Sequence, residues 1–247
     1  MNKLIWEQDF LNRNTDLSAW NIRSGNDLLD HEGNPISPGW GNGELQYYTG
    51  LADNLFINEF GLNLCARREV IEADGKHFDY TSARLDTKNH FSFRYGKLIV
   101  RAKLPVGQGL WPAIWLLPQH DTYGSWPASG EIDIMESRGR LPQQIWGTLH
   151  YGKDWDNKVI DEFSYEFKNG TINEFHDYGL EWDEGTIRWL VDGYCFAERQ
   201  LENGIMPFDE PFYLVLNLAV GGWFDHVPVD EAAFPAVMTV SSIQLYE

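Results

Sequence analysis

Apolar residues alternate with other residues at a period of two through much of this chain, and this pattern constrains the fold more than any other feature. In KLIVRAKLPV at 97–106, the apolar residues Leu98, Val100, Ala102 and Leu104 share one parity. Successive side chains of a β-strand point to opposite faces, so such alternation predicts strands. No segment shows a helical period sustained over three turns, which favours an all-β fold.

Many of the expected strands carry apolar or aromatic residues on both faces, as in FYLVLNLAV at 212–220. This is typical of two stacked sheets with a working surface on one outer face. Turn signals such as Asp192-Gly193 recur about every ten residues, the spacing of a β-sandwich. No linker, low-complexity tract or internal repeat divides the chain. We therefore predict one β-sandwich domain over residues 1–247.

The charge and the aromatic content narrow the range of partners. Lys and Arg number 19 against 37 Asp and Glu, which gives a net charge of −18. Nucleic acids and anionic membranes need a basic surface, so neither is expected as a partner, and a neutral polymer fits best. The 11 Trp residues exceed what a core requires and predict an exposed aromatic surface, which suits the apolar faces of sugar rings.

Two cysteines, Cys65 and Cys195, have no metal-ligand spacing. Both lie in apolar, strand-like runs, where a buried free thiol is more common than a disulfide, although one bridge stays open. The N-terminus has no apolar signal region and no run reaches transmembrane length, so the chain as written is expected to be soluble. The Gly- and Pro-rich segment 31–44 is predicted to be a long loop with an exposed Trp40, and loops of this kind usually carry function or disorder.

Three carboxylates lie within residues 131–136 of the segment GEIDIMES. On a regular strand Glu131 and Asp133 share one face, and Glu136 points to the other. If Met135 is the extra residue of a β-bulge, the alternation is reset and Glu136 returns to the face of the other two. Acidic residues are poor strand formers and like charges repel each other, so their clustering among apolar side chains needs a reason.

Retaining glycosidases provide such a reason. They need a nucleophile and a general acid/base roughly 5–5.5 Å apart, and a third carboxyl group can hold the nucleophile. Crowded negative charge also raises the pKa of one partner and keeps the acid protonated. The alternative is a solvated acidic face in a chain with 37 acids. The residue types alone place the catalytic interpretation slightly ahead.

The segment WPASGEIDIME at 126–136 closely resembles the catalytic strand of glycoside hydrolase family 16, whose signature is E-x-D-x-(x)-E. The version with the extra Met resembles the β-1,3-glucanase (laminarinase) branch. The resemblance covers nearly the whole chain through further blocks in the same order: WGNGELQYYT at 40–49, YTSARLDT at 80–87, FRYGKLIVRAKLPVGQGLWPAIWLLP at 93–118, GTLHYG at 147–152, GLEWDEGTIRWLVDG at 179–193 and PFYLVLNLAVGG at 211–222. It implies a curved β-jelly-roll sandwich of two antiparallel sheets with a concave substrate cleft.

By this resemblance Glu131 is the nucleophile, Asp133 its supporting carboxylate and Glu136 the acid/base. Six further residues match positions that contact the sugar chain: Trp126, Trp115, Trp111, His150, Asn42 and Arg84. Some of them have plainer alternatives. Trp111 could be an ordinary core aromatic and His150 a structural histidine, and a surface ion pair is nearly as good an interpretation for Arg84.

The chain departs from the family pattern at two places. The segment GGWFDHVPVD at 221–230 replaces the Asn-Trp-Pro-Gly of many laminarinases, and Trp223 is the candidate cleft residue there. Family members often bind one structural calcium ion, and Asp9 and Gly61 match two of its positions. Ser241 stands where an Asp is expected, and loss of a charged oxygen weakens a site for a hard cation. We expect calcium to bind weakly or not at all, and no cofactor to be required.

The resemblance implies retaining endo-hydrolysis of β-1,3-glucosidic bonds in a neutral β-glucan such as laminarin. The alternatives are a broader β-1,3(4)-glucanase, a hydrolase of galactans, a transglycosylase and a non-catalytic β-glucan-binding domain. Binding proteins of this kind typically lack one or both catalytic Glu residues, which this chain keeps. We expect a monomer, exported from the cell because a polysaccharide is too large to enter it, with its signal peptide absent from this sequence.

Overall fold

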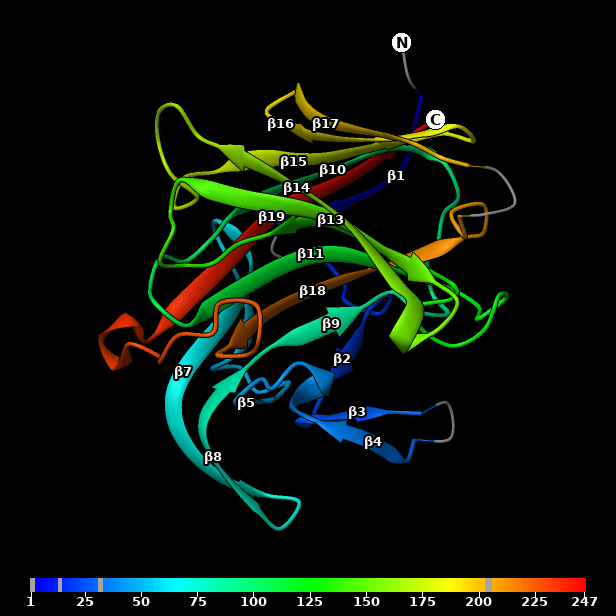
Figure 1. The fold of residues 1–247 in the computed structure, drawn as a ribbon. Coiled ribbons are helices and arrows are strands. Elements are labelled where there is room, and N and C mark those ends of the chain that lie inside the picture. Colours follow the sequence, from blue (N-terminus) through cyan, green and yellow to red (C-terminus); the bar gives the residue numbers. More distant parts are fainter. Residues whose placement is uncertain (1–2, 13–14, 31–32, 203–205) are drawn as a thin grey trace.

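The computed structural model describes residues 3–12, 15–30, 33–202 and 206–247. The secondary structure of these residues consists of strands and three single-turn 3-10 segments, with no α-helix. Figure 1 shows two layers, with β10 (Gly96–Lys103), β15 (His176–Trp182) and β19 (Ala236–Tyr246) in one. β11 (Leu110–Pro118) and β18 (Phe212–Val220) lie in the other. The predicted all-β sandwich of antiparallel sheets is confirmed.

One layer is a seven-stranded sheet in which all neighbours pair antiparallel. Its order is β14-β13-β12-β11-β18-β9-β2. The strands not yet bounded are β14 (Lys158–Glu166), β13 (Gln144–Gly152), β12 (Glu131–Glu136), β9 (Arg84–Asp86) and β2 (Asn21–Arg23). The acidic segment of the sequence, β12, therefore lies inside this sheet rather than at an edge.

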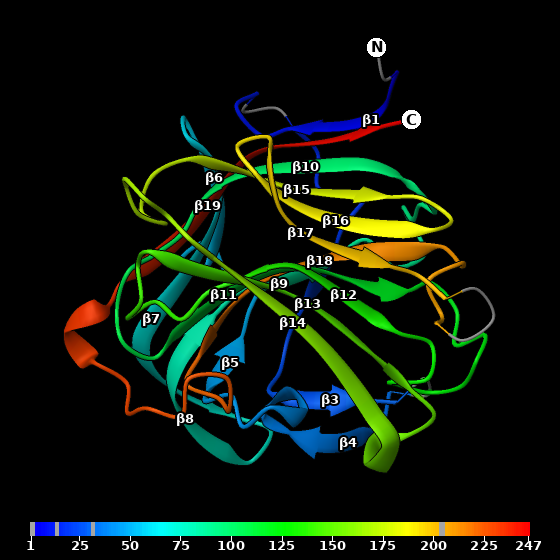
Figure 2. The same cartoon turned by 45° about the horizontal axis from the view of Figure 1, so that its top comes forward.

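The other layer has ten strands, in the order β17-β16-β15-β10-β19-β7-β8-β5, with β1 beside β19 and β6 beside β7. The remaining bounds are β17 (Tyr194–Gln200), β16 (Thr186–Val191), β7 (Gly61–Ala73), β8 (Lys76–Ser82), β5 (Gln46–Tyr48), β1 (Leu4–Asp9) and β6 (Leu55–Asn58). β5 pairs parallel with β8, and a separate hairpin joins β3 (Asp27–Leu29) to β4 (Pro35–Pro38). Figures 1 and 2 show β7 and β8 curving around one side of the molecule.

The core lies between the two sheets and follows the predicted parity. Leu98, Val100 and Ala102 of β10 are fully buried, whereas Arg101 between them is exposed. Every residue of β18 is buried. Leu214, Leu216 and Leu218 lie in the core, whereas Asn217 on the other face is hydrogen-bonded to Trp115 and Tyr48. Among the described residues, no helix is long and apolar enough to cross a membrane.

Two sequence predictions are wrong in part. Cys65 is a buried free thiol, as expected, but Cys195 is free and exposed, because its strand β17 lies at the edge of the sheet. The predicted loop 31–44, whose first two residues lie outside the described ones, contains the strand β4. Its Trp40 is only half exposed, since the ring packs against Tyr48 with centroids 5.6 Å apart.

Removal of a core side chain from the seven-stranded sheet tests this packing. Leu116 of β11 is fully buried and pairs with buried residues on both neighbouring strands. We expect Leu116→Ala to lower the free energy of unfolding by about 2–5 kcal/mol, because it leaves a cavity. Val70→Ala is the control, since Val70 is 64% exposed and a change there is expected to stay within about 0.5 kcal/mol. Equal urea midpoints for the two variants would contradict this account.

Candidate active site

The strand β12 carries a β-bulge between Asp133 and Glu136. On the β13 side Asp133 pairs with Thr148 and Glu136 with Trp146, so Ile134 and Met135 together face Gly147. On the β11 side the register also shifts between Ile114 and Trp115. There Met135 pairs with Ile114 and Asp133 with Trp115, so Ile134 is the residue without a partner. The predicted bulge is therefore present, but the assignment of Met135 as the extra residue is wrong on the β11 side. The side chains of Ile134 and Met135 are both buried in the core.

The bulge restores Glu136 to the face of Glu131 and Asp133. All three carboxylates line one small pocket on the outer face of the seven-stranded sheet. Its lining residues are Asn42, Glu44, Trp111, Ala113, Trp115, Glu131, Asp133, Glu136 and Asn217. Glu131 is half buried, whereas Asp133 and Glu136 are buried. A larger depression of about 640 Å³ lies on the other sheet beside Tyr95 and Lys97, and none of these carboxylates lines it.

Two tryptophans donate hydrogen bonds to the carboxylates of Glu131 and Glu136. The indole N–H of Trp126 donates to Oε2 of Glu131 at 2.5 Å, and that of Trp111 donates to Oε1 of Glu136 at 2.9 Å. Each bond holds one carboxylate oxygen and restricts the rotation of its side chain. The residue that could have been an ordinary core aromatic, Trp111, thus lines the pocket and touches the predicted acid/base.

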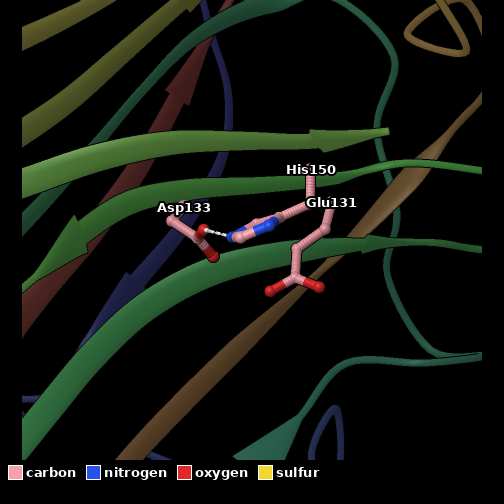
Figure 3. Close-up of side chains that lie close together, drawn as sticks. All are labelled: Glu131, Asp133 and His150. Atoms are coloured by element: carbon pink, nitrogen blue, oxygen red, sulfur yellow. Dashed lines mark ion pairs between the residues drawn. The ribbon is translucent and has the colours of Figure 1, made fainter. Parts of the chain in front are cut away.

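Asp133 lies close to both Glu131 and His150. Figure 3 shows its side chain directed toward His150, whose Nε2 lies 3.1 Å from Oδ2 of Asp133, with Glu131 beside them. Burial raises the pKa of Asp133 well above its ordinary value, and the charge of Glu131 and a hydrogen bond with it act in the same direction. A protonated Asp133 can therefore donate to the Glu131 carboxylate and hold it in place.

Glu136 has the electrostatics of a general acid. Burial raises its pKa well above the ordinary value, and the nearby charge of Asp133 adds to this. His150 and the hydrogen bond from Trp111 oppose the shift without cancelling it. Since the nucleophile must be ionised and the acid protonated at the same pH, two carboxyl groups in different surroundings are what the reaction requires.

A buried polar network lies under the predicted cleft floor. Trp115 donates its indole N–H to Asn217 at 2.7 Å, and Asn217 in turn donates to the hydroxyl of Tyr48 at 3.1 Å. Tyr48 donates to Glu44 at 3.0 Å, and Glu44 also accepts from Asn42 at 3.1 Å. The two predicted sugar contacts Trp115 and Asn42 are therefore joined through residues that the sequence analysis missed. Among these residues only Glu44 had a signal in the sequence, because it lies in the same WGNGE segment as Asn42.

Arg84 is buried and makes no surface ion pair, so that alternative is wrong for the described residues. Its guanidinium lies over the ring of Trp40 at 4.2 Å and over that of Trp115 at 4.8 Å. The charge of Arg84 also acts on the buried Glu44. This stacking orients the Trp115 ring. The contacts of Arg84 therefore support a role in orienting Trp115 more directly than a hydrogen bond from Arg84 to sugar.

Trp223 is 55% exposed and lies beside the loop that carries Asn42. Its backbone N–H donates to the Asn42 carbonyl at 2.8 Å, and its indole covers Gly43. The next residue, Phe224, stacks on Trp111 with ring centroids 5.2 Å apart. The unusual segment 221–230 is thus anchored beside the predicted acid/base.

A second exposed tryptophan, Trp155, was missed by the sequence analysis. It follows Asp154, which caps a 3-10 turn, and its ring lies 5.2 Å from that of Trp126. The ammonium group of Lys158 lies over both rings, at 4.9 Å from Trp126 and 4.7 Å from Trp155. No alternation or motif signals Trp155, because it lies between two strands.

The three calcium candidates lie near one another. Ser241 accepts a backbone hydrogen bond from Phe10, next to Asp9, and a Cβ on Gly61 would lie 2.9 Å from the Ser241 Cα. The Asp9 carboxylate, however, accepts from the Leu11 N–H, and the Ser241 hydroxyl donates to the Arg101 carbonyl. These side chains are engaged with the protein, so the set fits a hard cation poorly, and weak or absent calcium binding stays a prediction.

Comparison with known proteins identifies the family. Residues 40–234 match the family described as "Glycosyl hydrolases family 16". The chain belongs to this family. It is 39% identical over 99% of its length to glucan endo-1,3-beta-glucosidase A1 of Niallia circulans and 41% identical over 84% to a beta-glucanase of Rhodothermus marinus. It spans 38% and 76% of the lengths of these two proteins.

The family 16 chain also resembles a solved structure closely. The laminarinase catalytic domain of Thermotoga maritima superposes with a TM-score of 0.88 at 38% sequence identity. The likeness covers 100% of this chain and 98% of that domain. The curved jelly-roll sandwich implied by the sequence motifs is therefore correct.

The raised pKa of Glu136 predicts a stability change of defined sign. The folded protein holds this proton at pH values where the unfolded chain has released it, so the folded state loses stability as pH rises from the ordinary glutamate range. A glutamine at this position cannot ionise. We expect Glu136→Gln to raise the free energy of unfolding at pH 7 by about 1 kcal/mol or more and to lose this advantage near pH 4.

Glu198→Gln is the matched control for that measurement. Glu198 is an exposed glutamate whose pKa is lowered by the hydrogen bond from Arg188, so its replacement should bring no gain at pH 7. Urea unfolding of both variants and the wild type between pH 4 and pH 7 gives the comparison. A Glu136→Gln advantage that does not change with pH would contradict the assigned ionisation.

Proposed function

We propose that this chain hydrolyses β-1,3-glucosidic bonds within neutral β-glucans such as laminarin, with retention of configuration. The observation that carries this proposal is the bulged strand β12, which holds Glu131 and Glu136 on one face with Asp133 between them. Membership of family 16 and the names of the similar glucanases support the reaction and the type of bond.

The first chemical step uses both glutamates. Oε2 of Glu131 is held by the Trp126 N–H, and its other oxygen attacks the anomeric carbon to form a glycosyl-enzyme ester. Glu136 gives its proton to the glycosidic oxygen, so the leaving sugar departs neutral. In the second step the Glu136 carboxylate takes a proton from water, whose oxygen displaces Glu131 from the anomeric carbon.

Asp133 acts on the nucleophile rather than on the sugar. Its hydrogen bond with Glu131 keeps that carboxylate aimed, and its neutral form spares the site a second full charge beside the nucleophile. His150 pairs across the strands with Glu131, and its Nε2 lies 3.1 Å from Oδ2 of Asp133, so it contacts the aspartate beside the nucleophile. We propose that Asp133 and His150 position the nucleophile together.

The sugar chain would lie across the aromatic floor. Trp115 and the pocket tryptophan Trp111 present planar rings, while Asn42 supplies a polar contact at the pocket wall. The net charge of −18 suits a neutral polymer better than an anionic one. We also propose that the protein acts outside the cell and as a monomer, since the polymer cannot enter a cell and the pocket is complete within one chain.

Substitution of either glutamate tests the assigned roles. We expect Glu131→Gln and Glu136→Gln each to lower kcat on laminarin by at least about 10³-fold, with laminarin affinity in native gels retained. Asp133→Asn should lower kcat less, because Asp133 forms no bond to the sugar. Turnover close to that of the wild type in either glutamine variant would refute the assignment.

Product analysis tests the substrate. The wild type is incubated with laminarin, mixed-linkage β-glucan and agarose, and the released sugars are separated by size. A ladder of short oligosaccharides from laminarin alone supports endo-β-1,3 specificity, and equal release from the mixed-linkage polymer indicates a broader β-1,3(4)-glucanase. Longer products formed from laminarin oligosaccharides would reveal a transglycosylase, and binding with no release at all would indicate a recognition domain.

A further inference from the structure

A tryptophan of the opposite sheet reaches the bulge of the catalytic strand. Trp189 belongs to β16 in the ten-stranded sheet and is fully buried. Its indole N–H donates to the backbone carbonyl of Asp133 at 2.8 Å. This carbonyl comes immediately before the two bulge residues, Ile134 and Met135, where the regular ladder of β12 is interrupted.

The residue opposite the bulge makes room for this contact. Gly147 of β13 faces Ile134 and Met135, and a Cβ on it would lie 2.3 Å from Cδ1 and 2.6 Å from Nε1 of Trp189. Its backbone does not adopt the left-handed conformation, so the lack of a side chain serves the close approach of the indole rather than a turn. The same ring lies 5.1 Å from Phe163, which pairs with Gly147 from the other side.

We infer that Trp189 is a positioning residue, which locks the bulge of β12 and so sets the place of Glu136 relative to Glu131 and Asp133. The conformation of the bulge determines how Glu136 is placed relative to Glu131 and Asp133, because the pairing with β13 shifts there. A carbonyl bonded across the core cannot slide to pair with β13 or β11 without losing its partner. This inference rests on the proposed function of the two glutamates.

The geometry predicts which step suffers when the lock is lost. Glu136 lies beyond the bulge, whereas Glu131 and Asp133 lie before it in regular pairing with His150 and Thr148. A change in the register of the bulge therefore displaces Glu136 from the glycosidic oxygen. The nucleophile and the sugar contacts stay in place. A small misplacement of a catalytic group can reduce the rate by about 10²-fold.

Trp189→Phe removes the N–H donor and keeps most of the buried ring. We expect kcat on laminarin to fall by at least about 10-fold with KM within about 2-fold, because binding groups are untouched. The loss should be smaller on an aryl β-laminaribioside with a good leaving group, which needs little proton donation. The alkaline limb of the pH profile of kcat/KM should also move, since it reports the ionisation of Glu136.

Trp20→Phe is the matched control for a purely structural effect. Trp20 is a core tryptophan only 5% exposed, and its indole N–H donates to Gln8 at 3.3 Å, on β1 rather than on β12. This variant should lose stability without a change in the pH profile or in the ratio of the two substrates. If Trp189→Phe and Trp20→Phe agree in kcat, substrate ratio and pH profile, the positioning role is wrong.

Gly147→Ala provides a second route to the same contact, should Trp189→Phe fold poorly. Its methyl group must displace the indole, so it should reproduce the substrate ratio and the shifted alkaline limb. The double variant should show little further loss than the more affected single variant, because both changes break one bond. Full additivity, or a Gly147→Ala variant with unchanged kinetics, would overturn the inference.

The proposed hydrolysis and the positioning role of Trp189 can be refuted independently of each other. A wild type that releases no sugar from any glucan refutes the proposed hydrolysis. The lock itself is then still tested by a crystal structure of Trp189→Phe, in which we expect the register between Asp133 and Glu136 to shift or to adopt two arrangements. An active wild type with an unchanged bulge and unchanged kinetics in this variant refutes the lock alone.

Discussion

Two residues of β12, Ile134 and Met135, face the single residue Gly147 of β13, and the arrangement of the three carboxylates depends on this mismatch. A regular strand would send Glu136 into the core, where its charge could not be solvated. The side chains of Ile134 and Met135 instead both lie in the core, buried among apolar side chains. The bulge thus places apolar side chains in the core and keeps the three carboxylates on one face.

The chemistry follows from burial on that face. Burial raises the pKa values of Asp133 and Glu136, and the charges of the neighbouring acids in the same pocket act in the same direction. The indole N–H groups of Trp126 and Trp111 supply the donors that this crowded site needs. The cost in stability at neutral pH is the kind of local penalty expected where function overrides packing.

The substrate floor is supported from below in a comparable way. Trp115 is held at its edge by Asn217 and at its face by the guanidinium of Arg84. The hydrogen bonds continue through Tyr48 to Glu44, whose pKa is raised by burial, a shift that the charge of Arg84 opposes. Rigid aromatic rings bind sugar with little loss of side-chain freedom, so a buried network beneath them is a reasonable use of polar groups.

Local information in the sequence determined the strands, the sandwich and the acidic segment. Alternation of apolar residues is a property of neighbours, as in 97–106, and the same parity suggested the hypothesis of a bulge within 131–136. What the tertiary structure decided are contacts between residues far apart in the chain. The bond from Trp189 to Asp133, the burial of Arg84 between Trp40 and Trp115 and the exposure of Cys195 depend on which strands become neighbours. No local period encodes that choice, because it is set by how the two sheets pack together.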